Sequence, residues 1–266
     1  MKNNVVNKLF YSIAVYASIS MLYYFFTLYV YANEKDTNLN LVDSINEFFY
    51  ISNLNGHHTN ILKLTFSTLY YFFVNFTLAS LLGVFIGTAL GLNKYTGYIS
   101  NYYINFFRVM PSIIYIVLFK YQFKFTDNYI YFVGVFASIW PIIINTKSGV
   151  EKVNLVQREA IKILNLPFKR RLLSFVLPEA FPNIWDGMKI GLGISFLITI
   201  TCEYLYPDKL GMGAMLKNYE DNISPLVSMI IILWIGFMGI ILNFIFELFE
   251  TNLLWLRKQF STYEGD

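Results

Sequence analysis

The 266-residue sequence contains one cysteine and two histidines, and charged residues make up only 14% of it. A single cysteine, Cys202, excludes an internal disulfide and a cysteine metal cluster. An average soluble domain is about 25% charged, so the low charge argues against an ordinary soluble protein. The net charge of +3 is too small to indicate nucleic-acid binding.

Signals of catalysis are also missing. No Gly-x-x-x-x-Gly-Lys-Ser/Thr stretch occurs, so the chain does not offer that loop for nucleotide phosphates. No nucleophile, base and orienting group form a recognisable set. The pair His57-His58 has no carboxylate at helical metal-ligand spacing, which favours a solvated loop pair over a metal site. The sequence therefore predicts a protein that is not an enzyme and holds no cofactor of its own.

Hydrophobic residues make up 56% of the chain and gather in long uncharged runs. A helix needs about 20 apolar residues to cross a bilayer of about 30 Å. The runs predict an all-α membrane protein with six transmembrane helices, at residues 9–33, 64–93, 102–119, 128–146, 185–206 and 222–246. Arg108 interrupts the third span, and the charges at the ends of the fifth would snorkel to the interface.

The first run has a second interpretation. Residues 30–32, Val-Tyr-Ala, resemble the cleavage site of a signal peptide. The apolar stretch is longer than the usual 7–15 residues of such a peptide, which favours an uncleaved first helix.

Lys and Arg residues predict the orientation, because they gather in cytoplasmic loops. With the N-terminus inside, thirteen of them lie on the cytoplasmic side and six on the far side, Arg108 set aside. We therefore expect both termini in the cytoplasm. Residues 34–47 carry four acidic residues and one lysine and suit an outer loop.

The segment between the fourth and fifth spans is polar and basic. Eleven charged residues lie between Lys147 and Asp186. Each would cost roughly 2.5–3.5 kcal/mol at the bilayer centre, so the segment must lie in water or against protein. The pattern predicts a short helix at 158–164, a second helix that begins at Pro167 and ends at Pro178, and Pro182 before the fifth span. Such a helix pair fits either an interfacial helix on anionic lipid or a docking element for a cytoplasmic partner.

The same segment carries a spaced motif. Glu159-Ala160-Ile161 is followed after three residues by Asn165 and, nine residues later, by residues 175–178, Phe-Val-Leu-Pro. This resembles the cytoplasmic loop of binding-protein-dependent ABC importer permeases, which has Glu-Ala-Ala, Gly and Ile-x-Leu-Pro at these spacings. The departures from that pattern are Ile161, Asn165 and Phe175.

Further stretches resemble the branch of that family which serves sulfonate, nitrate, taurine and similar small solutes. They are residues 68–92, 106–112, 138–150, 187–205 and 209–216. The first contains Gly83, Gly87 and Gly91, a four-residue spacing that lets helices approach closely. The resemblance covers about residues 65–217.

The resemblance implies a type I ABC importer permease fold in the bacterial cytoplasmic membrane. Two permease subunits, expected as a homodimer, form the pathway, a cytoplasmic ATPase dimer holds ATP and Mg, and an extracytoplasmic binding protein delivers the solute. A short coupling helix at 158–165 docks on the ATPase. The implied docking residues are Arg158, Glu159, Ala160, Ile161, Asn165, Leu177 and Pro178.

Two charged residues in the spans are candidates for the pathway or a gate. Arg108, near the cytoplasmic end of the third span, would attract an anion, snorkel to headgroups or pair between helices. Glu203, at the outer end of the fifth span, would contact the binding protein, close an outer gate or face water. Gly211 and Gly213 permit a tight loop after that span.

Other polar and aromatic residues in the spans suggest packing. Asn75 and Asn145 are expected to form interhelical hydrogen bonds. The tryptophans are expected to pack or to anchor at the interface, and they are Trp140, Trp185, Trp234 and Trp255.

The domain division expected from the sequence is an N-terminal helix and outer loop at 1–60, a permease core at 61–257 and a cytoplasmic tail at 258–266. Two alternatives stay open. A secondary transporter would show related halves, and the two halves of this sequence do not look alike. A membrane anchor that recruits a cytoplasmic partner without transport would use the same polar segment. The solute, and the choice between homodimer and heterodimer, are not decided by the sequence.

Overall fold

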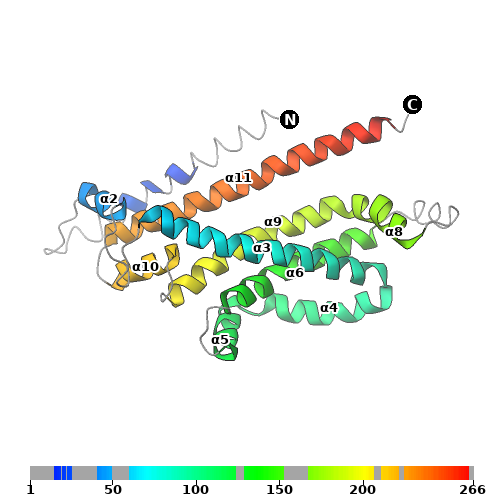
Figure 1. Cartoon of the computed structure of the whole chain (residues 1–266), viewed down its shortest axis with the longest axis horizontal. Coiled ribbons are helices and arrows are strands. Elements are labelled where there is room, and N and C mark those ends of the chain that lie inside the picture. The colour runs from blue at the N-terminus through cyan, green and yellow to red at the C-terminus, as the bar shows by residue number, and fades with distance from the viewer. Residues whose placement is uncertain are drawn as a thin grey trace. The chain divides into compact units, whose positions relative to one another are not determined.

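The computed structural model describes residues 15–18, 20–21, 23–25, 41–49, 60–123, 129–152, 167–206, 211–221 and 225–263. The regular elements in these stretches are helices, as the sequence predicts (Figure 1). They include α2 (Leu41–Phe49), α3 (Ile61–Leu92), α4 (Lys94–Val109), α5 (Ser112–Gln122), α6 (Tyr129–Glu151), α8 (Phe168–Arg171), the π-helix η1 (Leu172–Val176), α9 (Leu177–Leu205), α10 (Met212–Asp221) and α11 (Pro225–Tyr263).

Four of the described helices are long and apolar enough to cross a membrane. They are α3, α6, the run Phe168–Leu205 that joins α8 to α9, and Leu226–Glu250 within α11. The bent pair of α4 and α5 makes a fifth if it is counted as one span. These match the predicted second to sixth spans in position. The predicted first span, 9–33, lies mostly outside the described residues.

The third predicted span is not one helix. Residues 95–109 and 112–122 are bent by 92° at a break that contains Pro111. Met110, just before the proline, has φ −65° and ψ 127°, an extended conformation. A proline ring disfavours the helical conformation in the residue before it, so α4 must end there. The prediction of a continuous run over 102–119 is therefore wrong.

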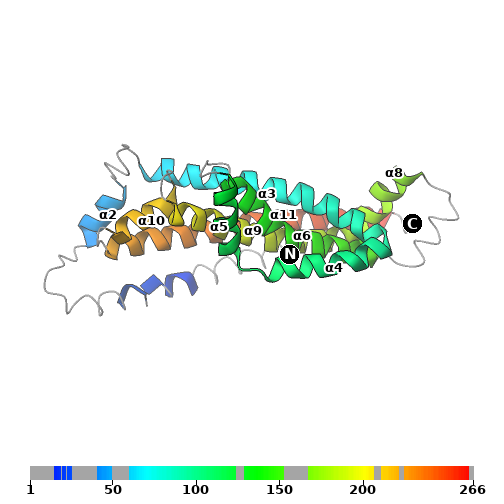
Figure 2. The ribbon, with the colours of Figure 1, turned by 90° about the horizontal axis from the view of Figure 1, so that it is seen from below.

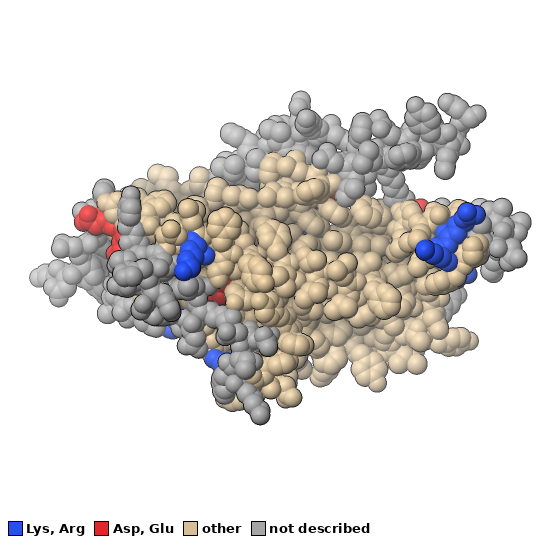
Figure 3. All heavy atoms as spheres, viewed as in Figure 1, with Lys and Arg blue, Asp and Glu red and all other residues tan. Residues whose placement is uncertain are grey.

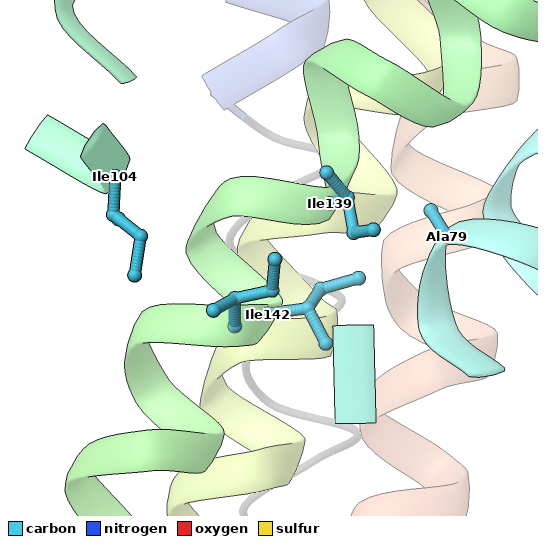
Figure 4. Packing of buried hydrophobic residues seen from close by; sticks show 5 residues of the cluster. Ala79, Ile104, Ile139 and Ile142 are labelled. Carbon is cyan, nitrogen blue, oxygen red and sulfur yellow. The ribbon is translucent and has the colours of Figure 1, made fainter. Parts of the chain in front are cut away.

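The chain forms two compact units, one of residues 1–68 and 200–266 and the other of residues 69–199. In the second unit, α3, α4, α6 and α9 run beside one another in both ribbon views (Figures 1 and 2). One core cluster there joins Ala79 of α3, Ile104 of α4 and Ile139, Ile142 and Ile143 of α6 (Figure 4).

Glycines bring α3 against α6. A Cβ added at Gly83 would lie 2.7 Å from Ile142 Cγ2, and one at Gly87 would lie 2.7 Å from Thr146 Cβ. One at Gly91 would lie 2.7 Å from the Cβ of Val150. Real Cβ atoms do not approach other atoms so closely, so these positions require glycine. The close helix contact expected from the four-residue spacing is confirmed.

Glycines of α9 approach α6 in the same way. A Cβ at Gly187 would lie 2.8 Å from Asn145 Cβ and 3.0 Å from the Pro141 carbonyl oxygen. One at Gly191 would lie 2.8 Å from Ile142 Cδ1. Glycines of α3 and α9 thus let both helices pack closely on α6, and Ile142 contacts a glycine of each.

Polar side chains add ties within this unit. Asn75 of α3 is buried and donates to the Ile130 carbonyl and to Thr199 Oγ1, each at 3.4 Å, so its predicted interhelical role is confirmed. Asn145 instead donates to the Pro141 carbonyl of its own helix at 2.8 Å. Its Cβ faces Gly187 of α9, and the amide turns back along α6.

We predict that Gly87→Ala destabilises the protein by roughly 1–3 kcal/mol, because the new methyl group meets Thr146 and the Ile143 carbonyl. Thermal unfolding of the purified chain in detergent measures this. Gly193→Ala is the matched control, since a Cβ there has nothing within 4 Å. It should leave stability unchanged or raise it by up to about 1 kcal/mol through helix propensity. Equal melting temperatures for the two variants would contradict the packing account.

Candidate functional site

Most of the predicted docking residues lie in a stretch that the structure does not describe. Helix α6 ends at Glu151, and the description resumes at Pro167. Arg158, Glu159, Ala160, Ile161 and Asn165 therefore lie outside the described residues, and their docking role stays a prediction.

The structure corrects the predicted boundaries after Pro167. Pro167 precedes α8 and accepts the Arg171 N–H at 3.0 Å, so the second helix begins where the sequence predicts. It does not end at Pro178, because α8, η1 and α9 form one apolar run to Leu205. Pro182, expected before the fifth span, lies inside α9.

A wide turn lets the helix pass Pro178. The Leu177 N–H bonds the Leu172 carbonyl, five residues back, and residues 172–176 are π-helical. Proline has no N–H to donate, and its ring crowds the preceding turn of an α-helix. The π turn directly before Pro178 widens that turn, a known way to insert such a residue without ending the helix.

The start of this run is basic and exposed. Lys169 and Arg170 are exposed, and the Arg171 guanidinium carbon lies 5.3 Å from the centre of the Phe168 ring. This is the basic patch over α8 in Figure 3. Neither α8 nor η1 contains an acidic residue.

In the other compact unit, Glu203 sits in the last turn of α9 and is fully buried. Its Oε2 accepts a hydrogen bond from Thr68 Oγ1 at 2.9 Å and another from the Gly213 N–H at 3.1 Å. Thr68 Oγ1 in turn accepts the Met212 N–H at 2.9 Å. No described residue donates to Glu203 Oε1.

These bonds cap α10 from outside its own sequence. The first N–H groups of a helix have no partner within it, and local Ser, Thr, Asp or Asn side chains usually supply one. Residue 211, just before α10, is a glycine and has no side chain that could accept a hydrogen bond from these N–H groups. Thr68 and Glu203 instead satisfy the N–H groups of Met212 and Gly213, and a carboxylate also suits the positive end of the helix dipole.

The glycines around the start of α10 allow this approach. A Cβ at Gly211 would lie 2.3 Å from the Glu203 carboxyl carbon, and one at Gly213 would lie 2.3 Å from the Ile200 carbonyl oxygen. Both glycines therefore lie in close contact with the end of α9. The loop expected before α10 falls on residues 207–210, which lie outside the described residues, so it stays a prediction.

Further contacts hold α10 in this unit. Thr65 Oγ1 of α3 donates to Met212 Sδ of α10 at 3.7 Å and accepts the Trp234 indole N–H of α11 at 3.1 Å. Tyr219 of α10 is hydrogen-bonded to Glu47 of α2, and burial, with this carboxylate, raises the pKa of Tyr219 to about 12. The segment from Glu203 to α10 is thus tied to α2, α3 and α11.

The structure narrows the roles open to Glu203 and Arg108. Glu203 is fully buried and so does not face water, while its roles toward a gate or a binding protein stay predictions. Arg108 is exposed in the last turn of α4. Because α4 begins at Lys94, Arg108 lies about 21 Å along the helix from that lysine at 1.5 Å per residue. The sequence predicts Arg108 near the cytoplasmic end because the predicted span begins at residue 102, whereas α4 already begins at Lys94.

The tryptophans pack as expected where the structure describes them. Trp140 stacks on Phe107 with ring centres 5.0 Å apart, and Trp234 meets Phe48 at 6.0 Å. His57, His58 and the side chain of Trp255 lie outside the description. Within the described residues, no group of three His, Cys, Asp or Glu side chains is placed to hold a metal ion.

The sequence singles out Glu203 and the two glycines but not Thr68, which lies 135 residues away from Glu203 in the chain. Thr68 stands in an apolar run without a local motif. Only the folded unit identifies it as the partner of both the carboxylate and α10.

We predict that Glu203→Ala destabilises the chain by roughly 1–3 kcal/mol, because it leaves the Gly213 N–H buried without a partner. Hydrogen exchange of peptides that cover α10 should become faster. Glu203→Gln is the matched control, since its amide oxygen can still accept both bonds, and it should stay close to wild type. Unchanged exchange in the alanine variant would show that the carboxylate does not hold α10.

Comparison with known proteins gives a family. Residues 79–254 match the binding-protein-dependent transport system inner membrane component family. The chain is 26% identical over 170 residues to a bicarbonate transport system permease protein of Synechococcus elongatus, covering 63% of this chain and 60% of that protein. It is 27% identical over 172 residues to a nitrate import permease protein of Synechocystis, covering 64% and 62%.

A putative aliphatic sulfonates transport permease protein of Bacillus subtilis is 26% identical over 195 residues, covering 72% of this chain and 68% of that protein. The crystal structure of an amino acid ABC transporter with histidines has a similar fold, with a TM-score of 0.61 and 16% identity over 81% of this chain and 100% of that one. The family match takes in well over half of the sequence. The chain therefore belongs to the binding-protein-dependent transport system inner membrane components, a family whose ABC transporter permease subunits are non-catalytic.

Proposed function

We propose that this chain forms the solute pathway of an ABC importer together with a second permease subunit, as a homodimer. ATPase subunits in the cytoplasm would dock on residues 158–183, and an extracytoplasmic binding protein would deliver the solute. The observation that carries this proposal is the family match over residues 79–254, which includes the docking segment.

The proposed architecture is the type I importer permease fold with six crossings and both termini in the cytoplasm. Support comes from the long apolar helices at positions two to six and from the likeness in fold to a whole transporter chain. The N-terminal crossing, 9–33, and its outer loop would precede a core at 61–257, with a short cytoplasmic tail after it.

Coupling would act through the run Phe168–Leu205. It begins directly after the proposed coupling helix, and its last turn carries Glu203. A displacement imposed by the ATPase would enter the fifth span at α8 without an intervening break. Glu203 would then act as a positioning residue that carries α10 with the end of α9, and not as a solute ligand.

The proposed solute is a small anion. The relatives are named for bicarbonate, nitrate and aliphatic sulfonates, which share small size and negative charge. Arg108, exposed at the bend between α4 and α5, is the proposed cation of the pathway. A charge within a membrane span is costly, so a functional reason for keeping it is expected.

The docking proposal predicts that Glu159→Lys sharply reduces recovery of the partner ATPase with the affinity-purified permease, while membrane insertion stays normal. Asp186→Lys is the control, because Asp186 is an exposed carboxylate of α9 outside the motif. Full recovery of the ATPase with the Glu159 variant would argue against the coupling helix.

The orientation predicts which side of the membrane each lysine faces. The native chain suits cysteine labelling, because its single cysteine, Cys202, is buried. Lys169→Cys should react with a membrane-impermeant maleimide in inverted vesicles and not in intact cells whose outer face is accessible. Lys63→Cys, exposed at the start of α3, should do the reverse. Labelling of residue 169 from outside would overturn the cytoplasmic docking segment.

A further inference from the structure

An apolar groove runs along α3 in the unit of residues 69–199. It has a volume of about 490 Å³. One wall is the face of α3 from Ser80 to Leu92, and the other is formed by Phe168, Leu172, Leu177 and Met188. The lining is apolar apart from two hydroxyl groups on α3.

The shape of the groove suits a single extended chain. Residues 80 and 92 are about 18 Å apart along a helix at 1.5 Å per residue. An acyl chain is narrow enough to lie in a space of about 490 Å³ along that length, whereas a helix about 10–12 Å across would contact the groove with one face only. The rim is open, since Leu81 and Phe85 are 65% and 75% exposed. Both walls belong to helices that are long and apolar enough to be candidate membrane spans, which makes a lipid chain a suitable occupant.

Positive charge is concentrated at one end of the groove. Phe168 lines that end, and Lys169, Arg170 and Arg171 follow it directly. The Arg171 guanidinium lies over the Phe168 ring at 5.3 Å, which holds a cation beside the groove lining. Leu92, the last residue of α3, lines the groove as well, so the apolar wall ends where α3 ends.

We propose that this groove binds one anionic phospholipid, with an acyl chain along α3 and the phosphate held by Lys169, Arg170 and Arg171. A soluble partner would match the charges but not an apolar channel of this length. A second copy of an apolar helix would match the channel's chemistry but not the three cations at its end. An anionic lipid satisfies both and joins α3 to the start of the docking helix. The proposal rests on the groove and its charges and does not depend on the transport function.

The test uses the full chain, purified in mild detergent and examined by native mass spectrometry with added phosphatidylglycerol. The wild type should retain one tightly bound phosphatidylglycerol per chain. The triple variant Lys169→Gln, Arg170→Gln, Arg171→Gln should bind it roughly tenfold to 100-fold more weakly, because each basic residue near the surface adds to the attraction for anionic lipid.

A second variant tests the groove without changing charge. Ala89→Phe places a bulky ring in the groove from the α3 wall and should also prevent the lipid from binding. Leu78→Phe is its control, because Leu78 is an exposed residue of the same helix outside the groove, and it should retain the lipid. Equal affinity for phosphatidylcholine, or retention of phosphatidylglycerol by the Ala89 variant, would overturn the site. If the Ala89 variant no longer formed a dimer but still bound the lipid, the groove would be assigned to a second copy of the chain instead.

Discussion

Inside a bilayer no water is present to drive apolar surfaces together, so helices must be held by close contact and by satisfied polar groups. This constraint explains the packing of α6. Glycines of α3 and α9 bring both neighbours to within van der Waals contact of its side chains and carbonyls, and Ile142 lies against Gly83 and Gly191 at once. The unit of residues 69–199 thus depends on the absence of side chains at a few positions of two flanking helices.

The same constraint governs the polar cluster around Glu203. Helix α10 begins after a glycine that cannot cap it, and its first N–H groups would stay unpaired in an apolar setting. Thr68 and Glu203 supply the missing acceptors, and the two hydrogen bonds to Oε2 in turn offset the burial of the carboxyl group. Cap and carboxyl group therefore stabilise each other.

Sequence reasoning succeeded where a local pattern determines the structure. Uncharged runs identified α3, α6 and α11, and the glycine spacing predicted that another helix packs closely on α3, while only the structure shows that this helix is α6. It failed at two prolines, because the effect of a proline depends on the turn around it. At Pro111 the preceding residue is extended and the helix ends. At Pro178 a π turn admits the ring and the helix continues. The role of Thr68 has no local signal, since it arises from a contact across 135 residues.

The helix continues through Pro178, which affects how the proposed docking segment would transmit force to the fifth span. A helix that ended at this proline would place a hinge between the proposed docking segment and that span, and the hinge would absorb displacement. The run Phe168–Leu205 has no such break. We expect it to bend most easily at the π-helix η1, where the backbone hydrogen bond spans five residues instead of four. The basic residues 169–171 come directly before that turn in the chain. Anionic lipid at the membrane surface and the proposed cytoplasmic partner would consequently act on the same short helical segment.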